Sequence, residues 1–292
     1  MSKAEKPRLL RWMYRIDYPL GPIEFRDLLG RGAETVLGKS AADAAAYAEA
    51  NLSGIWNYLL RAQNLDHQRG LHQIFRVEDG VAKRLRWCPS PDSATSKNSR
   101  EVLRLRSRHL ILAAIDQLND RQFEALGCVA SSVAGANQTL LTPHGNDKGV
   151  DFYATIVNPT RSHIFSGSLH PFRIVGQSKK YSSAVGVDKV NQLAKTLDYI
   201  RHASIKIIGT VPTWFRSADG PIVGWIIGDS GFQSGARDTA RDHGILLSDS
   251  LDIAELFAMS RSSSDVLPAT ARAAEFVDRI ISTLKAFSTS SV

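Results

Sequence analysis

The chain has 292 residues, 43% hydrophobic and 22% charged, which is ordinary globular composition for two domains or one large one. Two cysteines, Cys88 and Cys128, are too few for a disulfide framework or a zinc knuckle, and they fit a reducing compartment. Because there is no apolar run of about 18 residues and no apolar signal core at the N-terminus, we expect a cytoplasmic protein without a membrane span.

The net charge of +7 is unevenly distributed along the chain. Residues 1–110 hold 19 Lys and Arg and 12 Asp and Glu, whereas residues 111–292 hold 17 of each kind. Because neutralisation of phosphates by Lys and Arg supplies most non-specific affinity, a basic N-terminal region is suited to nucleic acid. A solvated basic surface with no partner is the alternative that charge alone leaves open.

The N-terminal region predicts helices followed by a hairpin. Residues 41–62 are Ala-rich with apolar side chains on one side, which predicts a helix. Residues 71–87 predict a β-hairpin whose turn lies at 78–80. This combination is compatible with a winged helix, for which the candidate nucleic-acid contacts are Lys83, Arg84 and Arg86.

A stretch rich in Ser and Pro at 88–100 predicts a linker. We therefore expect a DNA-recognition or sensor module over 1–100 and a second domain over 101–292. Helices and strands alternate in the second domain, which predicts an α/β fold with a mixed central sheet flanked by helices. The predicted helices are 101–117, 118–135, 187–201, 234–244, 251–260 and 270–287, and the predicted strands are 149–157, 171–181, 204–211, 221–229 and 245–249.

Three residues of this domain have the chemistry of a metal-dependent hydrolase. Asp151 begins one predicted strand, and Gln177 and Lys179 lie two apart on the next, so that both point to one face. A carboxylate and an amide oxygen are hard ligands suited to Mg²⁺, and a neighbouring lysine can orient a water molecule. By residue type alone, an exposed strand-end carboxylate and a solvated lysine would be the simpler interpretation.

The order of the surrounding motifs favours the catalytic interpretation. GNDKGVD (145–151), GQSKKY (176–181) and GDSGFQSGARDTARDHGILLSD (228–249) follow one another. Over about residues 118–258 this series resembles the Mrr-like branch of the PD-(D/E)xK nuclease superfamily. In this branch the motif reads Gln-x-Lys, with Gln at the position that is Asp or Glu elsewhere in the superfamily. The resemblance implies a restriction-endonuclease-like core.

It also implies roles for individual residues. Asp151 and Gln177 correspond to metal-binding positions, Lys179 to the catalytic lysine, and Glu124 to an acidic residue of the first helix that can reach the metal. Further candidates, in support of the site or in contact with nucleic acid, are Asp147, His144 and Lys180. Instead of a role in the site, Asp147 could equally cap a turn. For His144 a solvated loop side chain is the simpler interpretation.

We therefore expect an endonuclease that hydrolyses DNA with Mg²⁺, or with Mn²⁺ as a substitute, in restriction or phage defence. The expected partners are DNA, a second copy of the chain and a protein of a defence system. Three alternatives remain open at this point: a nuclease acting on RNA or on repair intermediates, a non-catalytic nucleic-acid-binding protein, and a partner-activated effector. Neither a serine hydrolase nor an ATP-binding motif is indicated.

Overall fold

The computed structural model describes residues 5–16, 21–78, 82–88, 104–143, 149–157, 170–260 and 269–290. The chain forms two compact units, one of residues 1–113 with 261–272 and one of residues 114–260 with 273–292. His144 and Asp147 lie outside the described residues. No helix of the described ranges has both the length and the apolar character needed to cross a bilayer.

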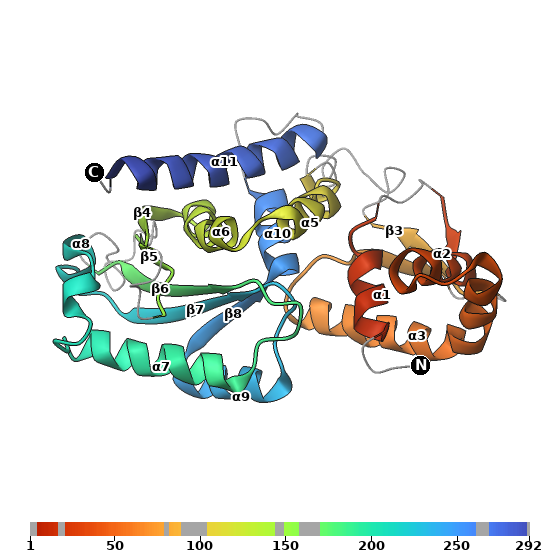
Figure 1. The fold of residues 1–292 in the computed structure, drawn as a ribbon, viewed down its shortest axis with the longest axis horizontal. Coiled ribbons are helices and arrows are strands. Elements are labelled where there is room, and N and C mark those ends of the chain that lie inside the picture. Colours follow the sequence, from red (N-terminus) through yellow and green to blue (C-terminus); the bar gives the residue numbers. More distant parts are fainter. Residues whose placement is uncertain are drawn as a thin grey trace. The chain divides into compact units, whose positions relative to one another are not determined.

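The first unit joins three helices to a small antiparallel sheet (Figure 1). Its sheet has the strand order β1-β3-β2, and its elements follow one another as α-β-α-α-β-β. The predicted hairpin is confirmed, since β2 and β3 pair antiparallel from Phe75↔Trp87 to Glu78↔Arg84. The elements are α1 (Glu5–Met13), β1 (Ile23–Glu24), α2 (Phe25–Leu37), α3 (Ala41–Gln68), β2 (Phe75–Glu78) and β3 (Arg84–Trp87).

Local signals set the boundaries of these helices. Gly38 adopts φ 66° at the end of α2, a left-handed conformation that glycine reaches at little cost. Ser40 then caps α3 by accepting a hydrogen bond from the backbone N–H of Asp43. The apolar stripe of α3 is buried, and its Trp56 ring packs edge-on against Phe25 of α2 at 5.0 Å between centroids.

The second unit is an α/β core with a five-stranded mixed sheet of order β4-β5-β6-β7-β8. Strands β4, β5 and β6 pair antiparallel, whereas β6, β7 and β8 run parallel, so the predicted mixed sheet is confirmed. The elements are α5 (Arg108–Gln117), α6 (Asp120–Val133), β4 (Ala136–Leu141), β5 (Phe152–Ile156), β6 (Phe172–Lys179), α7 (Val187–Arg201), η3 (Ile208–Thr210), α8 (Thr213–Arg216), β7 (Ile222–Gly228), α9 (Ser234–His243), β8 (Ile245–Asp249), α10 (Ser250–Met259) and α11 (Ala269–Ser290).

Helices cover both faces of this sheet, with α6 on one side and α7 and α9 on the other (Figure 1). Two glycines allow α6 to approach closely, because a Cβ at Gly127 of α6 or at Gly176 of β6 would overlap the ring of Phe152. The opposite face is covered by a core of α7 and sheet residues that includes Val175, Leu193 and Leu197. Residues of β6 therefore alternate between an even-numbered face toward α6 and an odd-numbered face toward α7.

One predicted strand was wrong, and one observed strand was not predicted. Residues 204–211 are turns and a 3₁₀ helix, because Ile207 and Val211 are buried four residues apart while Ile205 is 92% exposed, which is not strand alternation. Strand β4 was not predicted, since it lies between the predicted helix 118–135 and the predicted strand 149–157. It is an edge strand whose central residues 137–139 are polar, so it lacks the apolar pattern of a buried strand.

Candidate active site

The candidate site lies where β6 and β7 end and β5 begins. Asp151 immediately precedes β5, and its backbone N–H donates to the carbonyl oxygen of Gly176 on β6 at 2.8 Å. Since β5 and β6 are antiparallel, this pairing brings the start of one strand beside the end of the other. Lys179 is the last residue of β6 and pairs with Gly228, the last residue of β7.

Asp151 and Lys179 meet in this position. The Lys179 Nζ lies 3.6 Å from the Asp151 Oδ2, with side-chain exposures of 18% for the lysine and 4% for the aspartate. The same oxygen accepts a 2.6 Å hydrogen bond from the backbone N–H of Ser178. The backbone hydrogen bond fixes the carboxylate at the strand end, and the ion pair holds the lysine beside it.

Gln177 is buried on the same face, with 1% of its surface exposed. Its Nε2 donates to the carbonyl oxygen of Gly149 at 2.8 Å, which fixes the orientation of the amide. Its Oε1 is buried and has no hydrogen-bond partner among the described residues. An acceptor buried in this way costs free energy, of the order of 1–3 kcal/mol, unless a cation or donor satisfies it.

This donor set fits a hard divalent cation. Asp151 supplies a carboxylate and Gln177 supplies a buried amide oxygen, and both are ligand types of Mg²⁺. Within the described ranges no three His, Cys, Asp or Glu side chains cluster as a metal site. The site therefore has fewer carboxylates than a site with an acidic residue at position 177.

Glu124 approaches from α6, on the other side of the sheet. Its Oε2 forms a 2.5 Å ion pair with Arg121, whose second nitrogen donates to the carbonyl oxygen of Thr142 at 2.8 Å. The Thr142 hydroxyl in turn donates to the carbonyl oxygens of Val150 and Asp151. Glu124 is thus linked through Arg121 and Thr142 to the backbone that presents Asp151.

Lys180 points to the α6 side of the sheet, away from Lys179. Its ammonium donates to the carbonyl oxygen of Asp116 at 2.9 Å and to that of Leu118, at the C-terminal end of α5. Such carbonyls lack partners within their helix, and a cation there is also favoured by the helix dipole. Its role as a nucleic-acid contact stays a prediction, and the structure shows that it also anchors α5.

Two positions near Gln177 were missed by sequence reasoning. Gly149 has φ 82°, and a Cβ there would lie 2.8 Å from Nε2 of Gln192 on α7 and 3.2 Å from that of Gln177. Gln192 is an exposed residue, and its amide borders the site because it lies beside Gly149. A glutamine on a helix surface has no signal in a single sequence. The glycine did stand within the recognised motif, but as one of several.

The third missed residue is Asp229, which follows β7 and is 7% exposed. Its backbone N–H donates to the carbonyl oxygen of Lys179 at 3.0 Å, and its Oδ1 accepts a 2.7 Å hydrogen bond from Ser250. It therefore extends the β6–β7 pairing beyond Lys179 and stabilises the end of the strand that carries the lysine.

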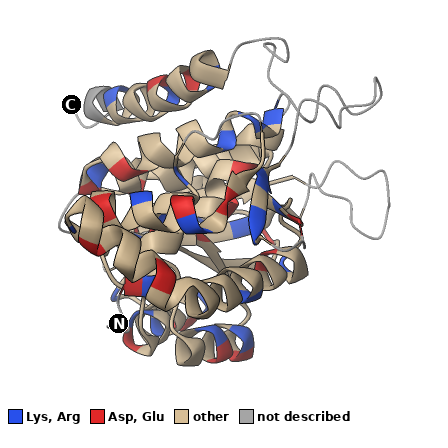
Figure 2. Ribbon diagram, turned by 90° about the vertical axis from the view of Figure 1, so that its right-hand side faces the viewer, with Lys and Arg blue, Asp and Glu red and all other residues tan. Residues whose placement is uncertain are grey.

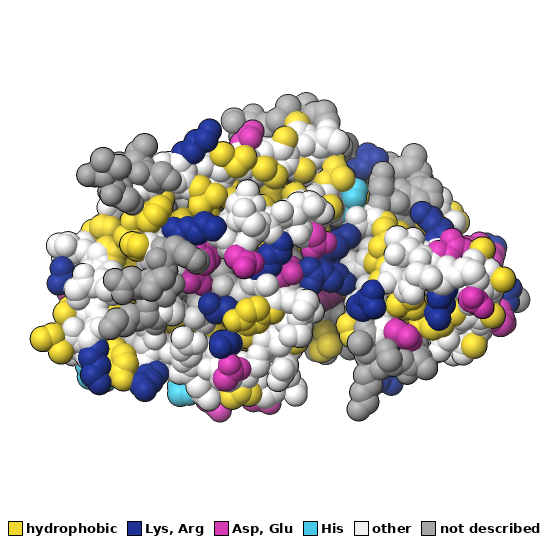
Figure 3. Space-filling view, in the orientation of Figure 1, with side chains coloured by type: hydrophobic (Ala, Val, Ile, Leu, Met, Phe, Trp, Pro, Cys, Tyr) yellow, Lys and Arg dark blue, Asp and Glu magenta, His cyan; other side chains and the backbone are white. Residues whose placement is uncertain are grey.

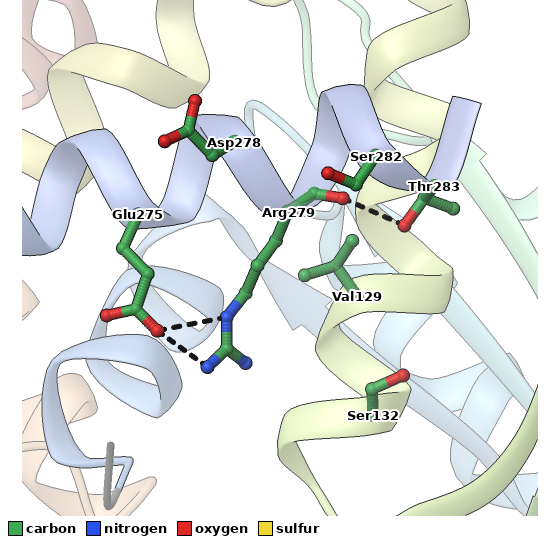
Figure 4. A pocket seen from close by; sticks show the side chains of 7 residues that line it. All are labelled: Val129, Ser132, Glu275, Asp278, Arg279, Ser282 and Thr283. Carbon is green, nitrogen blue, oxygen red and sulfur yellow. Dashed lines mark hydrogen bonds and ion pairs between the residues drawn. The ribbon is translucent and has the colours of Figure 1, made fainter. Parts of the chain in front are cut away.

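A pocket lies elsewhere in this unit, between α6 and α11 (Figure 4). It has a volume of about 370 Å³, and Val129 and Ser132 of α6 form one wall. On the α11 side, Arg279 bonds through two nitrogens to one oxygen of Glu275, at 3.2 and 2.7 Å. None of the candidate catalytic residues lines this pocket.

The five-stranded mixed sheet with helices on both faces is the restriction-endonuclease-like core that the motifs predicted, and Asp151, Gln177 and Lys179 lie at its adjoining strand ends. Residues 115–257 match the family Mrr_cat, described as restriction endonuclease. This match covers the part of the chain that carries the Mrr-like motifs.

Three solved structures are similar to the chain. The MspJI restriction endonuclease in complex with a 27-mer oligonucleotide is 15% identical, with a TM-score of 0.40 over 66% of this chain and 40% of that one. The DNA modification-dependent restriction endonuclease AspBHI is 18% identical, with a TM-score of 0.40 over 68% and 46%. The restriction endonuclease FokI bound to DNA is 9% identical, with a TM-score of 0.35 over 94% and 48%. The chain thus spans less than half the length of each, and no curated protein matches it.

Proposed function

We propose that the chain is a metal-dependent endonuclease that hydrolyses DNA phosphodiester bonds in restriction or phage defence. The observation that carries the proposal is the buried, unpartnered Oε1 of Gln177 beside the Asp151–Lys179 ion pair. Most buried side-chain oxygens have a hydrogen-bond partner, so an unpartnered one beside this ion pair is a candidate ligand atom for a cation. The family of residues 115–257 supports the reaction class.

In this proposal, Asp151 and Gln177 hold Mg²⁺, or Mn²⁺ as a substitute, and Glu124 can add a third oxygen. When bound, such an ion supplies positive charge that stabilises the developing charge on the phosphate. The Lys179 ammonium, held by Asp151, orients the attacking water and stabilises negative charge on the phosphoryl oxygens. His144 and Asp147 remain candidates for support of the site.

The remaining parts of the chain have proposed roles in binding. Residues 1–100 form a module that recognises DNA or senses a partner of a defence system, and Lys180 of the second domain is a candidate DNA contact. Because cleavage of both strands by a single-site enzyme needs two copies, we propose a homodimer with α11 as its candidate interface. Figure 3 shows hydrophobic side chains gathered on the surface where Figure 1 draws α11 and α6.

The test compares the full chain with its Lys179→Ala and Lys195→Ala variants on plasmid DNA, methylated genomic DNA and an RNA control. Lys195 is an exposed lysine of α7 and serves as the matched control. With Mg²⁺ or Mn²⁺ we expect DNA cleavage that EDTA abolishes, that Lys195→Ala retains and that Lys179→Ala loses by at least about 10²-fold. Sedimentation of the DNA complex measures whether two copies assemble.

Cleavage by the Lys179→Ala protein at the unmodified rate would exclude the assigned role. If the chain cleaved RNA but not DNA, the proposed substrate would be RNA. Folded protein that cuts neither nucleic acid in any of these metals would favour a non-catalytic or partner-activated nucleic-acid-binding protein.

A further inference from the structure

The charges of the first unit are concentrated away from the helix that would be expected to enter a DNA groove. In helix-turn-helix modules the second helix of the pair lies in the major groove. Here that helix is α3, which carries no Lys or Arg between Ala41 and Leu60 and has Asp43 and Glu49 exposed in this stretch. Its one arginine, Arg61, lies in the second half.

The N-terminus of α3 is also unsuited to phosphate. Helix N-termini attract anions through free N–H groups and the helix dipole. Ser40 already accepts from the backbone N–H of Asp43, and its hydroxyl donates to the Asp43 carboxylate at 2.6 Å. The first turn of α3 therefore has a capped donor and a negative charge where a phosphate would bind.

The sheet of the same unit has the opposite character. Along β2 and β3, Phe75 and Leu85 are buried, so the alternate residues Arg76, Arg84 and Arg86 lie on the outer face. Figure 2 shows Lys and Arg in blue and Asp and Glu in red along the ribbon. Arg76 and Arg86 are direct partners in the register of the two strands. Like charges placed directly opposite each other destabilise a sheet, and a nearby anion reduces this repulsion.

The acidic residues of this face only partly balance its arginines. Arg84 pairs with Glu24 at 3.3 Å, and Arg86 pairs with Glu78 at 2.9 Å. No carboxylate of the described residues forms an ion pair with Arg76, which is exposed. The excess positive charge of the outer face therefore lies at Arg76, beside the Arg86–Glu78 ion pair.

Cys88, just beyond β3, is a neighbour of this positive charge. Burial raises the pKa of the Cys88 thiol, and the positive charges of Arg76, Arg108 and Arg86 act in the opposite direction. Three guanidinium groups thus act on one sulfur atom. Arg108 is 3% exposed and bonds to the carbonyl oxygens of residues 72 and 73, so the accessible charge is that of the sheet arginines.

We propose that the first unit binds the phosphate backbone of duplex DNA through the outer face of its β1–β3–β2 sheet, centred on Arg76 and Arg86, and not through α3. The partner is DNA because two guanidinium groups fixed side by side match successive phosphates or one bidentate phosphate. This proposal rests on the proposed function, since it takes DNA as the substrate. The proposal specifies which face of the first unit binds DNA and excludes α3 from that face.

The experiment measures binding of a short DNA duplex by the full chain in EDTA, as a function of salt concentration. The variants are Arg76→Gln with Arg86→Gln, the same pair changed to Lys, and Arg61→Gln as the α3 control. Each phosphate contact contributes about 0.9 to the slope of log affinity against log salt. We expect the double Gln variant to lose about 1.8 of the slope, and the double Lys and Arg61→Gln variants to keep it.

An unchanged slope in the double Gln variant, or a loss confined to Arg61→Gln, would overturn the proposal. The double Lys variant controls for unfolding of the unit by glutamine, because lysine keeps the positive charge. If the double Lys variant is folded and still loses salt slope, the result counts against the sheet face as a phosphate-binding surface. Cleavage at low salt and saturating DNA distinguishes a failure of the sheet-face proposal from a failure of the proposed nuclease function. If the variants and the unmodified chain cut and bind DNA alike, only the sheet face is wrong, whereas an unmodified chain that neither binds nor cuts DNA contradicts the proposed function as well.

Discussion

Replacing Gln177 by glutamate tests the metal site through stability rather than activity. The amide Nε2 donates to the Gly149 carbonyl at 2.8 Å, and the residue is 1% exposed. In Gln177→Glu that hydrogen bond is lost, which costs about 1–3 kcal/mol when the acceptor stays buried. The new carboxylate is also desolvated beside Asp151, so we expect roughly 3 kcal/mol or more of destabilisation in EDTA. For a protein of this size that corresponds to a fall in Tm of about 6–12 °C.

A bound divalent cation should reverse this effect, because it neutralises the added charge and ligand binding stabilises the folded state. Thermal unfolding followed by circular dichroism, with EDTA and then with increasing Mg²⁺, measures both steps. Gln63→Glu is the matched control, since Gln63 is also buried and its Nε2 donates to the Phe75 carbonyl at 3.0 Å. We expect a comparable loss in EDTA but no recovery with Mg²⁺.

The pH dependence follows from the sign of the expected shift. Burial and the neighbouring Asp151 would raise the pKa of the introduced carboxyl above its unfolded value of about 4.3. The destabilisation is therefore absent below that value and grows as the pH rises toward the folded-state pKa. Equal responses of the two variants to Mg²⁺, or a Gln177→Glu protein as stable in EDTA as the unmodified one, would refute the metal assignment.

Three further predictions concern residues around the site. Gly149→Ala should lower stability by about 1–2 kcal/mol and reduce cleavage, because φ is 82° and the new Cβ would lie 2.8 Å from Gln192; unfolding and initial rates measure this. Lys180→Gln should lower the free energy of unfolding by about 1–3 kcal/mol, because the carbonyls at the end of α5 lose their donor; a fall of about 0.9 in the salt slope would show a phosphate contact as well. Burial raises the pKa of the Cys128 thiol to about 12, so in a Cys88→Ser background a thiol reagent at pH 8 should react only on unfolding; rapid labelling of native protein would contradict this.

Much of the site could be predicted from the sequence because its residues follow the strand period. Gln177 and Lys179 are two apart, and the structure does place both on the face of β6 that is turned toward α7. The helix over 187–201 was predicted with its observed bounds, since its apolar residues recur at helical spacing. The edge strand β4 had no such pattern, because Leu141 at its end is the one buried residue of the strand.

The missed parts depend on contacts between distant segments. Gln192 is one of several exposed polar residues on α7, and only the turn at Gly149 brings it to the site. Arg121 lies three residues before Glu124 and looks like an ordinary helix pair in the sequence. Its second bond, to the Thr142 carbonyl, connects α6 to the segment that precedes Asp151. A single sequence contains no signal for such bonds.

The alternation of β6 explains why its end is so densely polar. Gln177 and Lys179 point toward α7 and form the candidate site, whereas Ser178 and Lys180 belong to the other face. The backbone N–H of Ser178 still serves the site, because it donates to Asp151. Lys180 ties the same strand end to α5, so the strand cannot shift by one residue without exchanging the anchoring lysine with the catalytic one. We therefore expect the consecutive lysines to differ in role. Substitution of Lys179 should lower the rate of cleavage, and substitution of Lys180 should lower the stability of the fold.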